Sequence, residues 1–106
     1  AGGRMTVESR TMPTLLLTNA ERKALKARAH SLHPTVIVGA AGLTPAVLQE
    51  IDRALASHEL IKVRLAGADR DTRERSAEDV AEALSCAVVQ LIGHVLVVFR
   101  PFPEDA

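Results

Sequence analysis

The chain has almost no aromatic side chains. Only 2% of its 106 residues are aromatic, these being two Phe, and it contains neither Trp nor Tyr. A platform of aromatic rings on which nucleic-acid bases stack is therefore nearly excluded as a binding mode. Any contact with a nucleic acid would have to use the backbone and cationic side chains.

Cysteine and long apolar segments are also scarce. The single cysteine, Cys86, cannot form an internal disulfide, and no apolar run approaches the roughly 20 residues that a membrane helix needs. The N-terminal residues lack the charged, apolar and small-residue regions of a secretory signal. We therefore expect a soluble protein of a reducing cytoplasm that has no membrane partner.

No arrangement of residues in the sequence indicates catalysis. There is no Walker loop, dinucleotide-binding fingerprint, paired-carboxylate motif or grouping of Ser, His and Asp. His30 and His33 are close in sequence, but Pro34 ends the helix there, and no Cys pair or acidic ligand completes a metal site. We expect no enzyme activity, no small-molecule substrate, no cofactor and no metal.

The charge is distributed unevenly along a chain of ordinary globular composition. The formal net charge is zero, yet residues 1–65 hold nine Lys and Arg against five Asp and Glu, whereas residues 66–106 hold four against eight. This asymmetry permits a basic face on a neutral protein, but two solvated surfaces would produce it equally well. The length suits one domain. We expect a single domain at 14–103, after an arm at 1–13 that is disordered or left over from cloning.

The first half of the chain predicts two helices and two strands. Thr18 and Glu21 have the spacing of a capping box, which predicts a helix over 19–30, followed by a buried β-branched strand over 35–38. Thr44 before Pro45 predicts the start of a helix that ends near residue 58. The segment 59–65 alternates as a strand does, and this places Ile61, Val63 and Leu65 on the core face and Lys62 and Arg64 on the opposite face.

The second half predicts one helix and a hairpin. The helix is capped at either Asp69 or Ser76, and its apolar side contains Val80 and Leu84. The strands 88–92 and 95–99 flank a Gly93-His94 turn. A strand–helix–strand crossover is parallel and a hairpin is antiparallel, so we expect a small α/β sandwich with a four-stranded mixed sheet and three helices in the order αβαβαββ.

The most informative segment is Gly39-Ala40-Ala41-Gly42, between a predicted strand and a helix that starts at Thr44. Two glycines allow a tight turn and a close approach of the backbone to a ligand, and the N–H groups of the helix start suit a phosphate. The loop resembles the GxxG loop by which KH domains clamp a nucleic-acid backbone. A tight turn without a ligand is the alternative.

Several segments together resemble one family, the CRM domain, and within it the stand-alone bacterial YhbY-like proteins. The resemblance covers residues 17–101, and its most specific part is the glycine loop followed by the Glu59–Val63 segment, Glu-Leu-Ile-Lys-Val. It implies a fold similar to the C-terminal domain of translation initiation factor three and an RNA-binding function. It also implies an association of stand-alone members with precursors of the large ribosomal subunit. Many relatives carry a basic or polar residue between the two glycines, where this chain has Ala40 and Ala41.

The resemblance and the charge pattern together predict an RNA-binding site on a monomer. The resemblance places RNA at the glycine loop and at Lys62, and we add four cations because of their predicted faces. We expect ribosomal RNA in precursors of the large subunit as the partner. A module that docks on ribosomal proteins or assembly factors through its acidic second half is the alternative. The predicted RNA-binding residues are Gly39, Ala40, Ala41, Gly42, Thr44, Arg22, Lys23, Lys26, Lys62 and Arg64.

Overall fold

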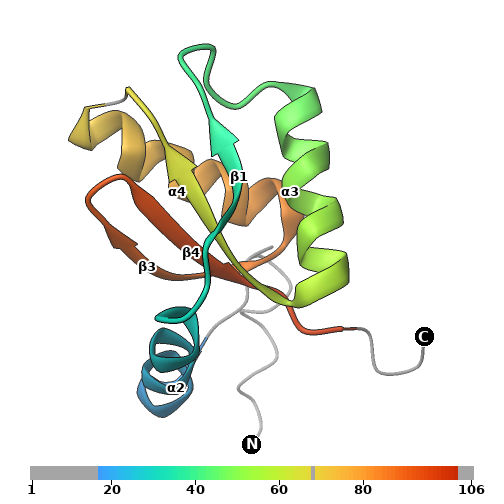
Figure 1. Ribbon diagram of the computed structural model, residues 1–106, viewed down its shortest axis with the longest axis vertical. Coiled ribbons are helices and arrows are strands. Elements are labelled where there is room, and N and C mark those ends of the chain that lie inside the picture. Colours follow the sequence, from blue (N-terminus) through green and yellow to red (C-terminus); the bar gives the residue numbers. More distant parts are fainter. Residues whose placement is uncertain (1–16, 68, 103–106) are drawn as a thin grey trace, which may run out of the picture.

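The computed structural model describes residues 17–67 and 69–102, and over these it shows three helices and one four-stranded mixed sheet (Figure 1). This is the fold class expected from the sequence. The predicted arm at 1–13 lies outside the described residues. In chain order the elements are α2 (Asn19–Ala29), β1 (Pro34–Val38), α3 (Pro45–His58), β2 (Leu60–Leu65), α4 (Arg70–Leu84), β3 (Ala87–Ile92) and β4 (Val95–Phe99).

The first two helices begin at the predicted caps. Thr18 accepts a hydrogen bond from the Glu21 amide at 3.0 Å, and the Glu21 carboxylate accepts one from the Thr18 amide at 2.9 Å. This is the reciprocal capping box, which satisfies two N–H groups that the helix itself cannot pair. Thr44 Oγ1 accepts from the Val47 amide at 3.2 Å at the start of α3. None of the helices within 17–67 and 69–102 is long and apolar enough to cross a membrane.

The third helix, α4, begins at the earlier of its two candidate caps. Asp69 Oδ1 accepts from the Thr72 amide at 2.8 Å, whereas Ser76 lies inside the helix. Hydrogen bonding to Thr72 lowers the pKa of the Asp69 carboxyl because it stabilises the charged form. The helix therefore includes the densely charged segment from Arg70 to Arg75, and its first turn lies beside the β3–β4 hairpin.

The four strands are ordered β1-β2-β4-β3 across the sheet. β1 and β2 are parallel, while β4 is antiparallel to both β2 and β3. The sheet is mixed because α3 connects β1 to β2 as a crossover and the Gly93-His94 turn connects β3 to β4 directly. Gly93 has a φ of +55°, a conformation that L side chains rarely adopt. This order makes β1 and β3 the two edges.

The main core lies between the sheet and the helices α3 and α4. Ile61, Val63 and Leu65 of β2 point into it, as their alternation predicts. They meet Ile51 and Leu55 of α3, both with no exposed surface. Complete burial of a side chain of this size contributes about 1.5–3 kcal/mol. This cluster fixes which way β2 faces, and so it determines the face on which Lys62 and Arg64 lie.

The opposite face of the sheet carries a second, smaller core under α2. Leu25 and Ala29 of α2 pack on Leu60, Val89 and Val97. Leu60 pairs with Phe99 at the beginning of β2, so α2 covers one end of this face. Lys62 and Arg64 lie further along β2 on the same face, where Lys62 is half-buried and Arg64 exposed.

The expectation that the first strand is buried was wrong for half of its residues. Val36 and Val38 are buried, but Thr35 is exposed and Ile37 is 63% exposed. The reason is that β1 is an edge strand with α3 on one face only, and α2 does not reach the other face at Ile37. β-branched composition alone does not distinguish an edge strand from a central one.

Candidate nucleic-acid interface

The glycine loop is a tight, exposed turn between β1 and α3. The Gly42 amide donates to the Gly39 carbonyl at 3.0 Å, and the Thr44 amide donates to the Gly42 carbonyl at 3.0 Å. Gly42 has a φ of +79°, so this position requires glycine. Within 17–67 and 69–102, neither Ala40 nor Ala41 donates its amide to a backbone carbonyl. Both alanines are exposed, so their N–H groups are available to an anion.

Thr44 is the N-cap residue of α3. It is half-buried, and its hydroxyl accepts from the Val47 amide. Its own carbonyl accepts from the Leu48 amide at 2.9 Å, as the first residue before a helix does. Thr44 therefore orients the first N–H groups of α3 beside the glycine loop, where the positive end of the helix dipole favours a negative group.

The part of the sheet that α2 leaves uncovered forms a continuous surface, which we call the open face. Ile37 pairs with Arg64, Arg64 with Val95, and Val95 with Ile92, so these four side chains form one row across all four strands. Lys62 and Gln90 lie in the next row toward α2, each paired with Val97. The open face consists of Ile37, Lys62, Arg64, Gln90, Ile92 and Val95, bordered by Lys26 and His30.

A hollow of about 220 Å³ lies where the open face meets α2. Lys26 and His30 line it from the helix side and Lys62 lines it from the sheet. No Asp or Glu is among its lining residues within the described part of the chain. Two cationic side chains therefore share a concave site without a neutralising carboxylate, which favours binding of an anionic group.

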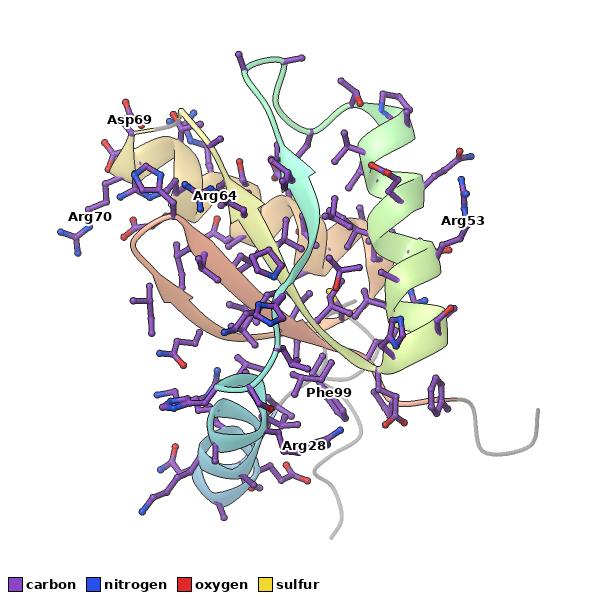
Figure 2. All side chains as sticks on the ribbon, viewed as in Figure 1. Arg28, Arg53, Arg64, Asp69, Arg70 and Phe99 are labelled. Carbon is purple, nitrogen blue, oxygen red and sulfur yellow. The ribbon has the colours of Figure 1, made fainter. Side chains whose placement is uncertain are left out.

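The structure brings together some of the predicted cations and separates others. Lys26 and Lys62 line the same hollow, and Arg64 lies two residues beyond Lys62, toward the glycine loop (Figure 2). Lys23 is exposed on α2. Arg22 is used internally, because its Nη1 donates to the carbonyl oxygens of Val88 and Val89 at 2.5 and 3.0 Å.

α2 carries three of the predicted RNA-binding cations, Arg22, Lys23 and Lys26, but it does not flank the glycine loop. α2 packs at the beginning of β2, whereas the loop follows the end of β1, where Val38 pairs with Leu65. Figure 1 shows α2 and the loop at opposite ends of the sheet. The cations of α2 therefore extend the open face away from the loop. Of the predicted cations, Arg64 is the one beside the loop, since its pairing partner, Ile37, lies two residues before Gly39.

Five residues of this surface were not predicted as site residues, namely Ile37, Gln90, Ile92, Val95 and His30. Ile37 and Ile92 are 63% and 59% exposed, and His30 follows α2 as its C-cap. The alternation of β1 could have revealed Ile37, because Val36 and Val38 occupy the core face on either side of it. Ile92 has no such signal, since its exposure depends on how far α2 extends over the sheet.

Among the residues that the structure describes, those outside this surface show no arrangement typical of metal binding. Among residues 17–67 and 69–102, no group of three or more His, Cys, Asp and Glu side chains could hold a metal ion. Cys86 has no exposed surface, and burial raises the pKa of its thiol to about 11, which disfavours the reactive thiolate.

Comparisons with known proteins give one consistent result. Residues 17–100 match the CRS1/YhbY (CRM) domain. A Haemophilus influenzae protein named RNA-binding protein is 47% identical over 88 residues, which cover 83% of this chain and 89% of the relative. A Pseudomonas aeruginosa protein named probable RNA-binding protein is 41% identical over 90 residues, which cover 85% of this chain and 86% of that relative. The solution structure of a hypothetical protein from Staphylococcus aureus superposes with a TM-score of 0.75 at 31% sequence identity. The superposition covers 86% of this chain and 95% of the Staphylococcus aureus chain.

Proposed function

This chain belongs to the CRS1/YhbY (CRM) domain family, and on that premise we propose that it binds RNA through the open face and the glycine loop. The observation that carries the proposal is the grouping of Lys62 and Arg64 on the open face with Lys26 of α2 at its border, and no carboxylate of the described residues lines the hollow between Lys26 and Lys62. The names of its relatives in Haemophilus influenzae and Pseudomonas aeruginosa support RNA as the partner.

The RNA makes three kinds of contact with this surface. The exposed amides of Ala40 and Ala41, with the first turn of α3, receive phosphate oxygens. Lys62 and Arg64 neutralise further phosphates and release their counterions, so affinity falls as salt rises. The exposed side chains of Ile37 and Ile92 offer apolar contact to sugars and base faces. Most of these contacts are to the backbone, so selectivity depends on RNA shape.

We further propose structured ribosomal RNA, in precursors of the large ribosomal subunit, as the target of a monomeric protein. Structured RNA suits a site that is rich in backbone contacts and has no aromatic platform, because the positions of the phosphates in a folded RNA carry the recognition. The function needs no cofactor, catalytic group or small-molecule substrate.

The experiment is a binding measurement across a salt series. Purified protein is titrated with large-subunit ribosomal RNA fragments and with an unstructured RNA. We expect preference for the structured fragments and a steep loss of affinity with salt, with a slope of about 0.7–0.9 for each phosphate neutralised. Lys62→Glu together with Arg64→Glu is expected to abolish binding at physiological salt while leaving the circular dichroism spectrum unchanged, since both side chains lie opposite the main core.

The matched control reverses the charge of two exposed arginines elsewhere. Arg53 extends from α3 away from the sheet (Figure 2), and Arg75 is exposed on α4. Arg53→Glu with Arg75→Glu changes the net charge by the same amount and is expected to retain most of the affinity. Equal loss in both double variants, or full binding by the folded Lys62 and Arg64 variant, would contradict the assignment. Weak binding to every RNA, together with capture of a protein partner whose binding does not depend on salt, would favour the alternative function. In that alternative the chain docks on ribosomal proteins or assembly factors.

A further inference from the structure

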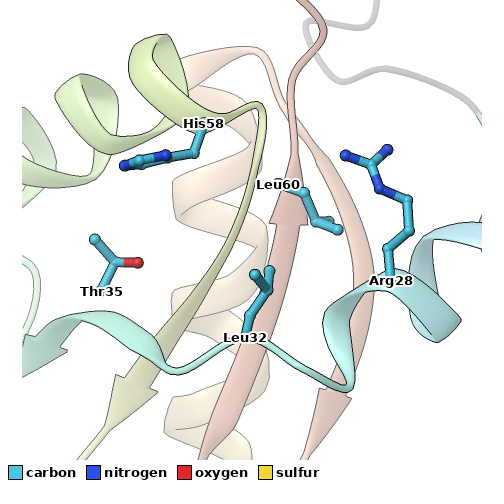
Figure 3. A pocket seen from close by; sticks show the side chains of 5 residues that line it. All are labelled: Arg28, Leu32, Thr35, His58 and Leu60. Carbon is cyan, nitrogen blue, oxygen red and sulfur yellow. The ribbon is translucent and has the colours of Figure 1, made fainter.

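A second hollow, outside the interface described above, lies between the C-terminal ends of α2 and α3. It has a volume of about 260 Å³ and is lined by Arg28, Leu32, Thr35, His58 and Leu60. Figure 3 shows Leu32 and Leu60 in the middle, with Arg28 on one side and His58 and Thr35 on the other. One concave site is therefore lined by residues of α2, the turn after it, β1, α3 and β2.

The hollow combines an apolar floor with polar side chains that have no partner within the described residues. Leu60 is buried and Leu32 half-buried, and both belong to the core under α2. The side chains of Arg28, Thr35 and His58 are exposed, and each makes no hydrogen bond or ion pair with another residue in 17–67 and 69–102. No carboxylate lines the site there. The hollow thus offers donors and a cation around an apolar floor.

This chemistry suits a flat, apolar-faced group that carries acceptors and is attached to an anion. A volume of 260 Å³ lies just below the roughly 300–1,000 Å³ of pockets for drug-sized ligands, so the occupant is smaller than those. Unstacked RNA bases bind against His rings and Arg guanidinium planes as well as against Trp, Tyr and Phe. His58 and Arg28 supply such planes in a chain that has no Trp or Tyr.

The hollow lies near the proposed RNA-binding surface. Leu60 of the floor and Lys62 of the open face are two residues apart on β2 and lie on the same side of the sheet. β1 connects Thr35 at the hollow to Gly39, the first residue of the loop after the strand, over about 13 Å at the usual rise of 3.3 Å per residue. An RNA strand that follows this edge of the sheet would therefore connect the loop, Arg64 and the hollow.

We propose that the hollow takes one unpaired nucleotide of the bound RNA. Its base lies on Leu32 and Leu60 between the Arg28 and His58 planes, and its phosphate lies toward the Arg28 guanidinium. This inference rests on the proposed RNA-binding function and adds to it a requirement for an unpaired base, which phosphate contacts alone cannot read.

The test compares two RNA hairpins that differ only in the presence of one base. Both carry a single-nucleotide bulge in the same stem, and in the second hairpin the bulged nucleotide is abasic, so the backbone and its charge are unchanged. The wild-type protein is expected to bind the first hairpin about tenfold more tightly, which is within the range for one stacked base. His58→Ala is expected to reduce this preference while leaving affinity for the abasic hairpin nearly unchanged. Arg28→Ala is expected to reduce the preference and also to weaken binding to both hairpins, because both keep the phosphate that Arg28 contacts.

Two further variants serve as controls, one for the loss of a positive charge and one for the loss of an aromatic ring. Arg53→Ala removes the same charge from an exposed position on α3, away from the hollow, and is expected to keep the preference. His58→Tyr retains an aromatic plane and is expected to keep it as well. Equal affinity of the wild-type protein for both hairpins would overturn the nucleotide pocket and leave RNA binding intact. Absence of binding to either hairpin and to the ribosomal fragments would overturn the proposed function, and the pocket with it.

Discussion

Arg22 and Val88 are joined by a hydrogen bond between the arginine Nη1 and the valine carbonyl oxygen, at 2.5 Å, although 66 positions separate them in the sequence. The same nitrogen donates to the Val89 carbonyl at 3.0 Å, next to the point where the pairing of β3 with β4 shifts between Val88 and Gln90. One guanidinium thus satisfies two carbonyls at an irregularity of the sheet edge and attaches α2 to β3.

Arg22→Ala is therefore expected to destabilise the fold rather than to weaken RNA binding directly. Hydrogen bonds from a charged donor contribute about 1.5–3 kcal/mol, and we expect a loss of that order in the free energy of unfolding measured by urea denaturation. Lys23→Ala is the matched control, because Lys23 is the exposed neighbour on the same helix, and it is expected to change stability by less than about 0.5 kcal/mol. Equal stability of the two variants would show that the contact to β3 contributes little.

Substitutions in the glycine loop test its proposed contact with phosphate, because one of them is expected to raise the affinity for RNA. Ala41 is exposed between the two glycines, and within the described chain its amide donates to no backbone carbonyl. Ala41→Lys adds a cation where the proposal places a phosphate, so we expect tighter binding and a salt slope steeper by about one. Ala41→Asp is expected to weaken binding at the same position. Gly42 is unsuitable for such a test because its φ of +79° strains any other residue.

The result that contradicts this role is equal affinity and equal salt slope in both variants of Ala41. The control is Ala83→Lys, which adds the same charge at an exposed position of α4. α4 packs on the face of the sheet opposite the open face. A similar gain from Ala41→Lys and Ala83→Lys would mean that net charge, and not the loop, determines the affinity.

Because the thiol of Cys86 is buried, we expect the protein to lose stability at alkaline pH. The folded protein holds the pKa of the thiol at about 11, chiefly by burial and with a smaller opposing effect of Arg100, against an ordinary value of 9.0. Between these pH values the unfolded chain releases the proton and the folded chain keeps it. The contribution of this thiol to stability is therefore constant below about pH 9 and is lost as the pH rises toward 11. At 1.36 kcal/mol per pH unit, the expected fall is roughly 2–3 kcal/mol.

Urea denaturation across this pH range measures the effect. Cys86→Ala is expected to remove this part of the fall, although the loss of packing lowers its stability at every pH. A fall of the same size in Cys86→Ala would assign it to other groups. The wild-type thiol should also resist alkylation at pH 8 until the protein unfolds.

Most of the fold could be predicted because its determinants are local. The capping box of Thr18 and Glu21 depends on residues three positions apart, and so does the Thr44 cap of α3. The alternation of Ile61, Lys62 and Val63 determines which side chains face the main core. The exposure of Ile37 could not be predicted in this way, because it depends on the place of β1 at the edge of the sheet.

The candidate site could be predicted only in part. The glycine loop is a continuous segment, and the structure shows the turn that its two glycines indicate. The open face is assembled from four strands and the end of α2, so its rows of side chains exist only through strand pairing. Their charge and their position on the helix predicted that Arg22 and Lys26 belong to the same RNA-binding site. In the structure, Lys26 lines the hollow beside Lys62, whereas Arg22 donates to backbone carbonyls of β3.

The sequence by itself determined the elements, their order, the face of β2 that enters the core and the presence of a tight turn before α3. These follow from capping, hydrophobic periodicity and glycine, which act over a few neighbouring residues. Only the tertiary structure decided which cations remain available and where they gather. That outcome depends on α2 covering one end of the sheet and on Arg22 binding a strand 66 residues away, and contacts between such distant residues leave no local pattern in the chain.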